Sequence, residues 1–166
     1  MTNILVGGSF SKIFFSDNGS TSVEVALKMA LQYWHNKNIN NKINIIAFEG
    51  AYHGDTFGAM SIAERNAFNA AFSKHLFKVS HIPIPTKENI KEVTQKFTAL
   101  TDKENVAAFI FEPLVQGAGG MRMYSAKHLD NLLSIAKKKN IICIADEVMT
   151  GFGRTGKNFA VEYLKN

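Results

Sequence analysis

The fold is decided by residues 105–146, which read NVAAFIFEPLVQGAGGMRMYSAKHLDNLLSIAKKKNIICIAD. Residues 105–112 and 141–146 are short apolar runs, typical of buried strands. Residues 125–139 lie between them and predict a helix that begins at Ser125. Its buried side carries four apolar residues at helical spacing: Leu129, Leu132, Leu133 and Ala136. A strand–helix–strand unit of this kind joins parallel strands by a right-handed crossover, so we predict an α/β fold with a mainly parallel sheet.

The segments before residue 105 extend the same pattern. Asn18–Thr21 offers capping residues in front of a helical stretch that reaches Trp34. Residues 64–84 show no clear period, and we expect them to be mostly irregular. The other predicted elements are strands at Lys12–Asp17 and Lys42–Phe48 and helices near Phe57–Ala63 and Lys87–Leu100. Together these elements predict a three-layer domain with helices on both faces of the sheet.

Composition sets broad limits on the class of protein. The chain has 166 residues, of which 46% are hydrophobic and 20% charged, and these values fit one globular domain. Its apolar runs are too short to cross a bilayer, and residues 1–8 lack the pattern of a signal peptide, so we expect no membrane partner. Cys143 is the only cysteine. A reducing, cytoplasmic setting is therefore the simplest interpretation.

The net charge of +5 raises the question of nucleic-acid binding, but only Arg65, Arg122 and Arg154 among the 19 basic residues are arginines. The lysines are scattered along the chain. Their one run, Lys137–Lys139, falls where a helix should end, and cations there suit the helix dipole. The pattern therefore argues against nucleic acid as a partner.

Three polar segments follow predicted strands, and ligands of open parallel sheets bind beyond the carboxyl ends of the strands. The first segment, Asp17–Thr21, precedes a helix whose free N–H groups could hold a phosphate. In that case Gly19 would permit close approach and Ser20 would add a hydroxyl. The alternative is an ordinary N-cap, which is the commoner use of such residues.

The second segment is Tyr52–Thr56, where the Tyr52 ring could stack on a planar ligand. His53 and Asp55 could equally be turn and cap residues. No further His or Cys lies nearby at ligand spacing, which argues against a metal site. The third segment begins at Asp146. A carboxylate that leaves an apolar run needs a cation, a set of donors or a metal, or else it caps the next turn.

Residues 151–157, GFGRTGK, have the glycine and lysine spacing of a phosphate-binding loop of NTPases. However, Asn158 stands where Ser or Thr would hold magnesium. The preceding strand also ends at Asp146, too early for a tight strand–loop–helix geometry. The sequence therefore disfavours an NTPase, which would bind nucleotide through Lys157.

Several segments resemble the class III aminotransferases, which are fold-type I enzymes that use pyridoxal 5′-phosphate. The resemblance rests on residues 14–30, 50–61 and 144–148. Residues 112–124 and 150–160 resemble the branch of this family that acts in biotin synthesis. The resemblance implies amino transfer from S-adenosylmethionine to 8-amino-7-oxononanoate, while another amine or ω-amino-acid substrate stays open.

The resemblance also implies a cofactor site made of five residues. Gly19 and Ser20 would hold the cofactor phosphate. Tyr52 would line one face of the cofactor ring and contact the substrate, and Val148 would pack on the other face. Asp146 would pair with the pyridine nitrogen and keep it protonated, as the ring needs in order to accept electrons.

Two departures from the family pattern stand out. Met149 replaces the glutamine of many relatives, and the biotin branch tolerates an apolar residue there. The Schiff-base lysine is absent, because Lys157 and Lys165 are the only lysines after Asp146 and neither matches its position. We therefore expect residues 1–166 to be part of a cofactor-binding large domain, without the catalytic-lysine segment and small domain of a complete, homodimeric enzyme. The alternative is a non-catalytic fragment that associates with itself.

Overall fold

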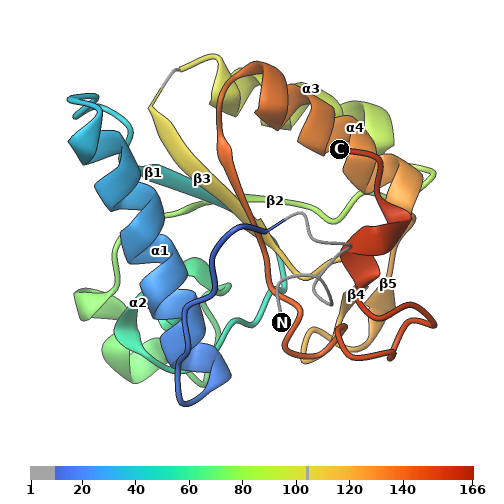
Figure 1. The fold of residues 1–166 in the computed structure, drawn as a ribbon, viewed down its shortest axis with the longest axis horizontal. Helices are drawn as coiled ribbons and strands as arrows, with labels where there is room; N and C mark the ends of the chain where they lie inside the picture. Colours follow the sequence, from blue (N-terminus) through green and yellow to red (C-terminus); the bar gives the residue numbers. More distant parts are fainter. Residues whose placement is uncertain (1–9, 104) are drawn as a thin grey trace.

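The computed structural model describes residues 10–103 and 105–166. At its centre lies a four-stranded sheet of order β2-β1-β3-β6, in which every neighbouring pair of strands is parallel (Figure 1). A separate antiparallel pair, β4-β5, lies beyond the end of β3. The strands are β1 (Asn44–Phe48), β2 (Ser80–Ile82), β3 (Val106–Phe111), β4 (Val115–Gln116), β5 (Arg122–Met123) and β6 (Ile142–Ala145).

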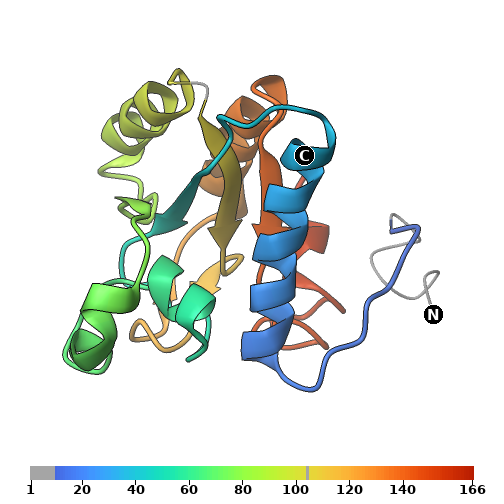
Figure 2. The ribbon, with the colours of Figure 1, turned by 90° about the vertical axis from the view of Figure 1, so that its left-hand side faces the viewer.

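Helices cover both faces of the sheet, as predicted. Helices α1 and α2 lie on one face, and α3 and α4 lie together on the other (Figures 1 and 2). The α-helices are α1 (Gly19–Asn36), α2 (Phe57–Ile62), α3 (Ile90–Thr101) and α4 (Ala126–Lys138), and the 3₁₀-helices are η2 (Ala70–His75) and η3 (Ala160–Tyr163). None of the helices in the described ranges is both long and apolar enough to span a membrane.

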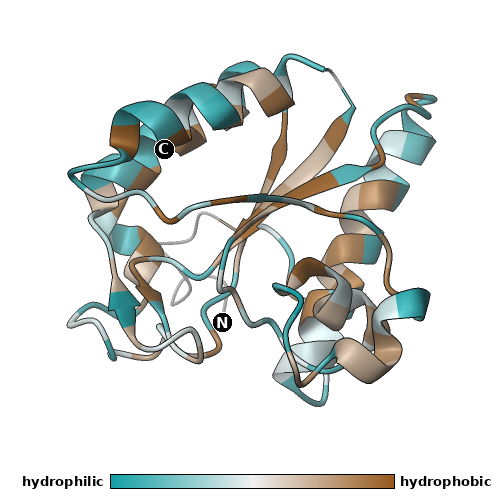
Figure 3. Ribbon diagram, turned by 180° about the vertical axis from the view of Figure 1, so that it is seen from behind, coloured by the Kyte–Doolittle hydropathy of each residue, from teal (hydrophilic) through white to brown (hydrophobic). Residues whose placement is uncertain are grey.

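The core is divided by the sheet into two clusters, because successive side chains of a strand point to opposite faces. Phe48 and Phe109 pack edge to face, with ring centroids 5.3 Å apart, in the cluster under α3 and α4. Ile45 and Ile110 belong to the cluster under α1 and α2. Figure 3 shows the same division, since the strands are apolar and the polar sides of the helices face outward. The three-layer α/β prediction is confirmed.

The strand–helix–strand unit of residues 105–146 forms as predicted. Strands β3 and β6 pair in parallel, with α4 as the connection between them. Ser125 caps α4, because its hydroxyl oxygen accepts a hydrogen bond from the amide of His128 at 3.2 Å. Lys137 and Lys138 occupy the last turn of α4, where their charge suits the helix dipole.

The predicted strand at Lys12–Asp17 is wrong, because this segment is irregular and pairs with no strand in the described part of the chain. Phe14 and Phe15 are 63% and 76% exposed. A strand is stable only where it pairs with a neighbour and packs against a core, and Lys12–Asp17 is instead mostly exposed.

The expectation that residues 64–84 are mostly irregular missed β2, which has only three residues and pairs with β1. Arg65 organises the segment before β2. Its guanidinium donates to the carbonyl of Met60 at 2.9 Å, near the end of α2, and to the carbonyl of Phe77 at 2.9 Å. A three-residue strand is too short to show a period in the sequence.

Candidate functional site

A cavity of about 430 Å³ lies at the carboxyl edge of the sheet, between the start of α1 and the segments that follow β1, β3 and β6. Sequence segments more than 100 residues apart meet there. All five residues predicted for the site line this one cavity: Gly19, Ser20, Tyr52, Asp146 and Val148.

The first wall of the cavity is the N-terminus of α1. Asn18 is the N-cap, since its Oδ1 accepts a hydrogen bond from the amide of Thr21 at 2.9 Å. The amides of Gly19 and Ser20 have no acceptor among the described residues, as expected at the start of a helix. A Cβ on Gly19 would lie 2.9 Å from Cγ2 of Val148, so glycine permits this close approach.

The second wall is the segment after β1. The Tyr52 hydroxyl donates to the Asp55 carboxylate at 2.8 Å, and this hydrogen bond raises the pKa of Tyr52 above its ordinary value. The amide of Asp55 in turn donates to Oγ of Ser20 at 3.2 Å, which joins this segment to α1. Gly54 has φ +115°, and a Cβ there would lie 2.2 Å from Oγ of Ser20. Only glycine fits this crossing of the two segments.

The third wall carries Asp146, which follows β6 and is 9% exposed. Its Oδ1 accepts a hydrogen bond from the amide of Val148 at 3.1 Å, so the turn-capping alternative is correct for one oxygen. Its Oδ2 lies 2.7 Å from Nδ1 of His53, which is 3% exposed. The other oxygen of the carboxylate therefore has a partner that the sequence did not indicate.

Glu112, directly after β3, joins the segment after β1 to the loop that follows β4. Its Oε1 accepts from the amide of Tyr52 at 3.3 Å, and its Oε2 accepts from the amide of Gly117 at 2.9 Å. The side chain is buried, and burial raises the pKa of this carboxyl group above its ordinary value. Met149 also lines the cavity and lies close to Gly117.

The segment that carries Asp146 and Val148 is anchored from behind by Glu147. Its carboxylate accepts hydrogen bonds from the amides of Ala160 at 2.7 Å and Val161 at 2.8 Å, at the start of η3. It also accepts from the hydroxyl of Thr150 at 3.1 Å.

The loop that imitates a phosphate-binding motif has a different geometry from that motif. Residues 151–157 form turns that lead to the short η3, with no α-helix after them in the described chain. The Lys157 ammonium donates to the carbonyl of Glu162 at 2.8 Å and lies 4.4 Å from the ring centroid of Tyr163. The loop therefore lacks the strand–loop–helix arrangement that an NTPase needs.

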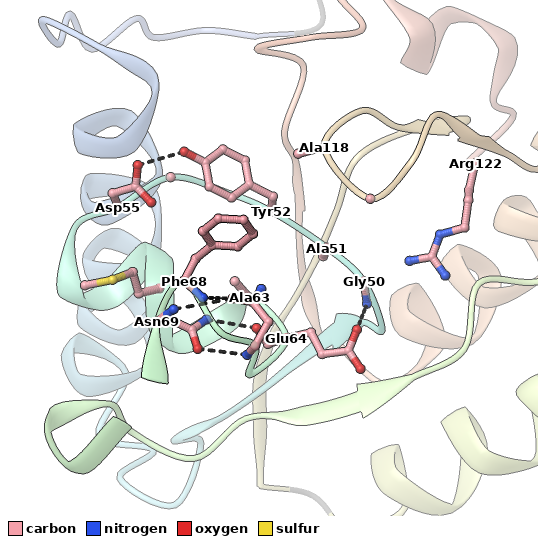
Figure 4. A pocket seen from close by; sticks show the side chains of 14 residues that line it. Gly50, Ala51, Tyr52, Asp55, Ala63, Glu64, Phe68, Asn69, Ala118 and Arg122 are labelled. Atoms are coloured by element: carbon pink, nitrogen blue, oxygen red, sulfur yellow. Dashed lines mark hydrogen bonds between the residues drawn. The ribbon is translucent and has the colours of Figure 1, made fainter. Parts of the chain in front are cut away.

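A second cavity, of about 640 Å³, adjoins the first and shares Tyr52, Gly54 and Ala118 with it. Figure 4 shows Tyr52 above the Phe68 ring and Arg122 at the opposite end of this cavity. Phe68 is 94% exposed. Tyr52 thus stands at the boundary between the two cavities.

Sequence reasoning assigned no site role to His53 or Glu112, although both line the first cavity. The sequence favours a turn role for His53 over a metal-binding one, and no spacing rule links it to Asp146, 93 positions away. Among the described residues, no lysine lines either cavity. Across the described residues, no three His, Cys, Asp or Glu side chains gather in a way that could hold a metal ion.

The structure is a parallel sheet between two layers of helices, with a cavity at the carboxyl edge of the sheet, and this is the architecture of the large domain of fold-type I aminotransferases. The family Aminotransferase class-III matches residues 1–166. The chain belongs to the class III aminotransferases.

Individual relatives are similar over nearly the whole chain. An adenosylmethionine-8-amino-7-oxononanoate aminotransferase of Synechococcus elongatus is 52% identical over 160 residues, which are 92% of this chain and 38% of the relative. The crystal structure of the enzyme of that name from Methanocaldococcus jannaschii has a TM-score of 0.83 at 36% identity, and covers 92% of this chain and 34% of its own. A PMP-bound aminotransferase from Vibrio fluvialis has a TM-score of 0.84 at 26% identity, and covers 92% of this chain and 36% of its own. The chain therefore spans little more than a third of the length of these relatives.

Proposed function

We propose that the 430 Å³ cavity binds pyridoxal 5′-phosphate, and that the protein transfers an amino group from S-adenosylmethionine to 8-amino-7-oxononanoate. The observation that carries the cofactor proposal is the convergence of Gly19, Ser20, Tyr52, Asp146 and Val148 on one cavity. The class III family and the PMP-bound relative support the same cofactor.

The residues present fit a phosphorylated pyridine chemically. The amides of Gly19 and Ser20 lie at a helix N-terminus without acceptors of their own in the described chain, which suits an anionic phosphate. Asp146 is a buried carboxylate that lines the same cavity, which suits a protonated ring nitrogen. The volume of the cavity is within the usual range for sites that hold small molecules.

Each wall would make its own contribution to the chemistry. When bound, the cofactor supplies a ring that accepts electrons from the substrate. Gly19 and Ser20 would fix the phosphate and so set the position of the ring, and Val148 and Tyr52 would cover its two faces and exclude water. Asp146 would hold the proton on the ring nitrogen, because a carboxylate in a buried site favours the charged form of its partner.

The proposed substrates rest on the names of the relatives and on the position of Tyr52. The Synechococcus elongatus relative shares 52% of the aligned residues with this chain. Tyr52 lines both cavities and is 45% exposed, so its ring can meet a substrate that occupies the second cavity. An experiment must distinguish these substrates from the alternative, another amine or an ω-amino acid.

We further propose that these 166 residues bind the cofactor without catalysing transfer by themselves. No lysine in residues 10–103 or 105–166 lines the cavity, and the Lys157 ammonium donates to the carbonyl of Glu162. The lysine that binds the cofactor covalently would then be supplied by sequence outside residues 1–166.

The cofactor proposal is tested by titration of the chain with pyridoxal 5′-phosphate, followed by fluorescence and absorbance. We expect saturable binding that Asp146→Ala and Ser20→Ala both weaken. Lys157→Ala is the matched control, because this residue lies outside the cavity, and it should leave binding unchanged. Absence of saturable binding to the unaltered chain would refute the proposal, and magnesium-dependent nucleotide binding lost in Lys157→Ala would support the NTPase instead.

The remaining parts of the proposal have separate tests. Borohydride reduction of the loaded chain, followed by mass spectrometry, should show no stoichiometric adduct on a single lysine, and such an adduct would contradict the claim that the chain is inactive alone. Calorimetric titration of the loaded chain should show tighter binding of 8-amino-7-oxononanoate and S-adenosylmethionine than of β-alanine. Tyr52→Ala should weaken the binding of both proposed substrates. Preference for β-alanine would favour an ω-amino-acid substrate.

A further inference from the structure

Phe68 is an exposed aromatic residue that lines the second cavity, of about 640 Å³. At 94%, it is the most exposed of the large hydrophobic residues in the described ranges. A ring that is so exposed is not stacked on Tyr52, although both side chains line this cavity and Figure 4 shows Tyr52 above Phe68. The two rings therefore present their surfaces to the same open space.

The backbone that carries Phe68 is held in place by hydrogen bonds. The Phe68 amide donates to Oδ1 of Asn66 at 2.8 Å, and the Asn66 amide donates to Oδ1 of Asn69 at 3.0 Å. Nδ2 of the buried Asn69 donates to the carbonyl of Glu64 at 2.9 Å. The Glu64 carboxylate accepts from the amide of Gly50 at 2.6 Å, in the segment after β1. These hydrogen bonds tie the Phe68 loop to the second wall of the first cavity, so the place of Phe68 is set before any ligand binds.

Two aromatic rings that face one open space suit a ligand with a planar aromatic group. Aromatic side chains attract a flat ring that stacks on their faces, and they do so for every nucleobase. The two proposed substrates differ in this respect. S-adenosylmethionine carries a purine ring, whereas 8-amino-7-oxononanoate has an aliphatic chain between its polar groups. Stacking in the second cavity would therefore favour the amino donor.

The charges around the second cavity favour the same substrate. The sulfonium centre of S-adenosylmethionine is positively charged and lies next to the adenosine group. The carboxylates of Asp55 and Glu64 line this cavity together with the two rings, and Figure 4 shows Arg122 at the opposite end. Carboxylates attract a cation, and so do the faces of aromatic rings. The end that carries Tyr52 and Phe68 is therefore suited to a cationic ligand with a purine ring.

We propose that Tyr52 and Phe68 form a slot for the adenine ring of the amino donor, and that Phe68 determines specificity for S-adenosylmethionine. The inference rests on the proposed function and deepens it, because it assigns one part of one substrate to the second cavity. The two cavities share Tyr52 and Ala118, so a donor in the slot lies next to the proposed cofactor site. An aromatic ring has two faces, so Tyr52 can border the cofactor with one face and the adenine with the other.

The test compares ligands that contain the purine with ligands that lack it. Phe68→Leu keeps an apolar side chain without a ring, and we expect it to bind S-adenosylmethionine about tenfold more weakly than the unaltered chain, which is equivalent to about 1.4 kcal/mol. Adenosine alone should lose affinity to a similar extent. Phe68→Tyr keeps the ring and should bind both ligands within about threefold of the unaltered chain. Pyridoxal 5′-phosphate and 8-amino-7-oxononanoate should bind both variants within about twofold, because Phe68 does not line the first cavity.

NMR provides a readout that a merely structural role of Phe68 would not change. The adenine protons should shift upfield on binding to the unaltered chain and to Phe68→Tyr, because stacked aromatic rings shield them, and the shift should be smaller with Phe68→Leu. Phe15→Leu is the matched control, because Phe15 is also exposed but lines neither cavity. It should leave both the affinity and the shift unchanged. Urea unfolding of each variant shows that the comparison is made between folded proteins.

The outcomes distinguish the slot from the proposed cofactor site. If the unaltered chain binds pyridoxal 5′-phosphate but neither adenosine nor S-adenosylmethionine, only the slot is overturned. Equal affinity of Phe68→Leu and the unaltered chain for these two ligands overturns it as well. If Phe68→Leu instead weakens the binding of 8-amino-7-oxononanoate, the second cavity takes the amino acceptor and the slot is wrong. If adenosine binding depends on Phe68 while pyridoxal 5′-phosphate does not bind, the slot is supported and the cofactor site fails.

Discussion

Replacement of Glu147 by alanine should lower the free energy of unfolding by about 3 kcal/mol. The carboxylate accepts three hydrogen bonds, two of them from the amides of Ala160 and Val161. The amide of the fully buried Ala160 would lose its partner, and an unsatisfied buried donor costs about 1–3 kcal/mol. Val161 is half-buried, so water can compensate part of its loss. Since a domain is stable by only about 5–15 kcal/mol, the effect is large.

Urea unfolding provides the measurement, because Trp34 is the only tryptophan and is 5% exposed. Glu147→Gln keeps one acceptor oxygen and should lose about half as much stability as Glu147→Ala. Hydrogen exchange should show faster exchange of the amides of Ala160 and Val161. Glu92→Ala is the control, because this exposed side chain makes no hydrogen bond or ion pair in the described structure, and it should cost less than about 1 kcal/mol. If Glu147→Ala matches Glu92→Ala in both assays, the anchoring role of Glu147 is refuted.

Three further substitutions test the cavity and the core. Gly19→Ala places a methyl group 2.9 Å from Cγ2 of the exposed Val148 side chain, which must shift within the cavity. The substitution should weaken binding of pyridoxal 5′-phosphate with little change in stability, and unchanged binding in the titration would contradict the close approach. Glu112→Gln should reduce the loss of stability that accompanies rising pH. The folded chain holds the Glu112 proton more tightly than the unfolded chain, so the free energy of unfolding falls as pH rises above the ordinary pKa of 4.5. Urea unfolding over a pH series measures how the free energy of unfolding changes with pH. An equal slope in the variant and the unaltered chain would contradict the assignment to Glu112. Trp34→Phe removes the indole N–H that donates to the carbonyl of Ala107 at 2.9 Å, and it should lower the free energy of unfolding by about 1–3 kcal/mol. Unfolding followed by circular dichroism measures the loss, and a loss below about 0.5 kcal/mol would show that the carbonyl finds another partner.

The sequence predicted the central part of the fold well because local and long-range signals agree there. Residues 105–146 contain two apolar strands and an amphipathic helix in the order that a right-handed crossover requires, and the cap at Ser125 marks where that helix begins. The alternation of residues along β1 and β3 then explains why both faces of the sheet are covered.

The wrong and missed strands show what a local pattern cannot decide. Lys12–Asp17 has the composition of a strand, but strand formation depends on pairing with a neighbour, which a sequence segment does not contain. The reverse holds for β2, which is ordered by its pairing with β1 although its three residues carry no periodic signal.

The position of the candidate site could be predicted, but the hydrogen bonds within it could not. Carboxyl ends of parallel strands share one edge of a sheet, so Tyr52 and Asp146 were expected to converge, and both line the same cavity. The pairing of His53 with Asp146 depends on side-chain orientation across β3. The role of Glu112, which accepts from the amides of Tyr52 and Gly117, depends on loop conformation as well.

These hydrogen bonds have a consequence for how a ligand would meet the site. A buried carboxylate without partners would change its protonation or its orientation, and the cavity would then have to reorganise when a ligand enters. Asp146 instead has a partner at each oxygen, and Glu112 holds the neighbouring loops by their amides. The amides of Gly19 and Ser20 have no acceptors in the described chain. Under the proposed function these two amides would take the phosphate, whereas Asp146 is already oriented by His53 and Val148 before any ligand binds.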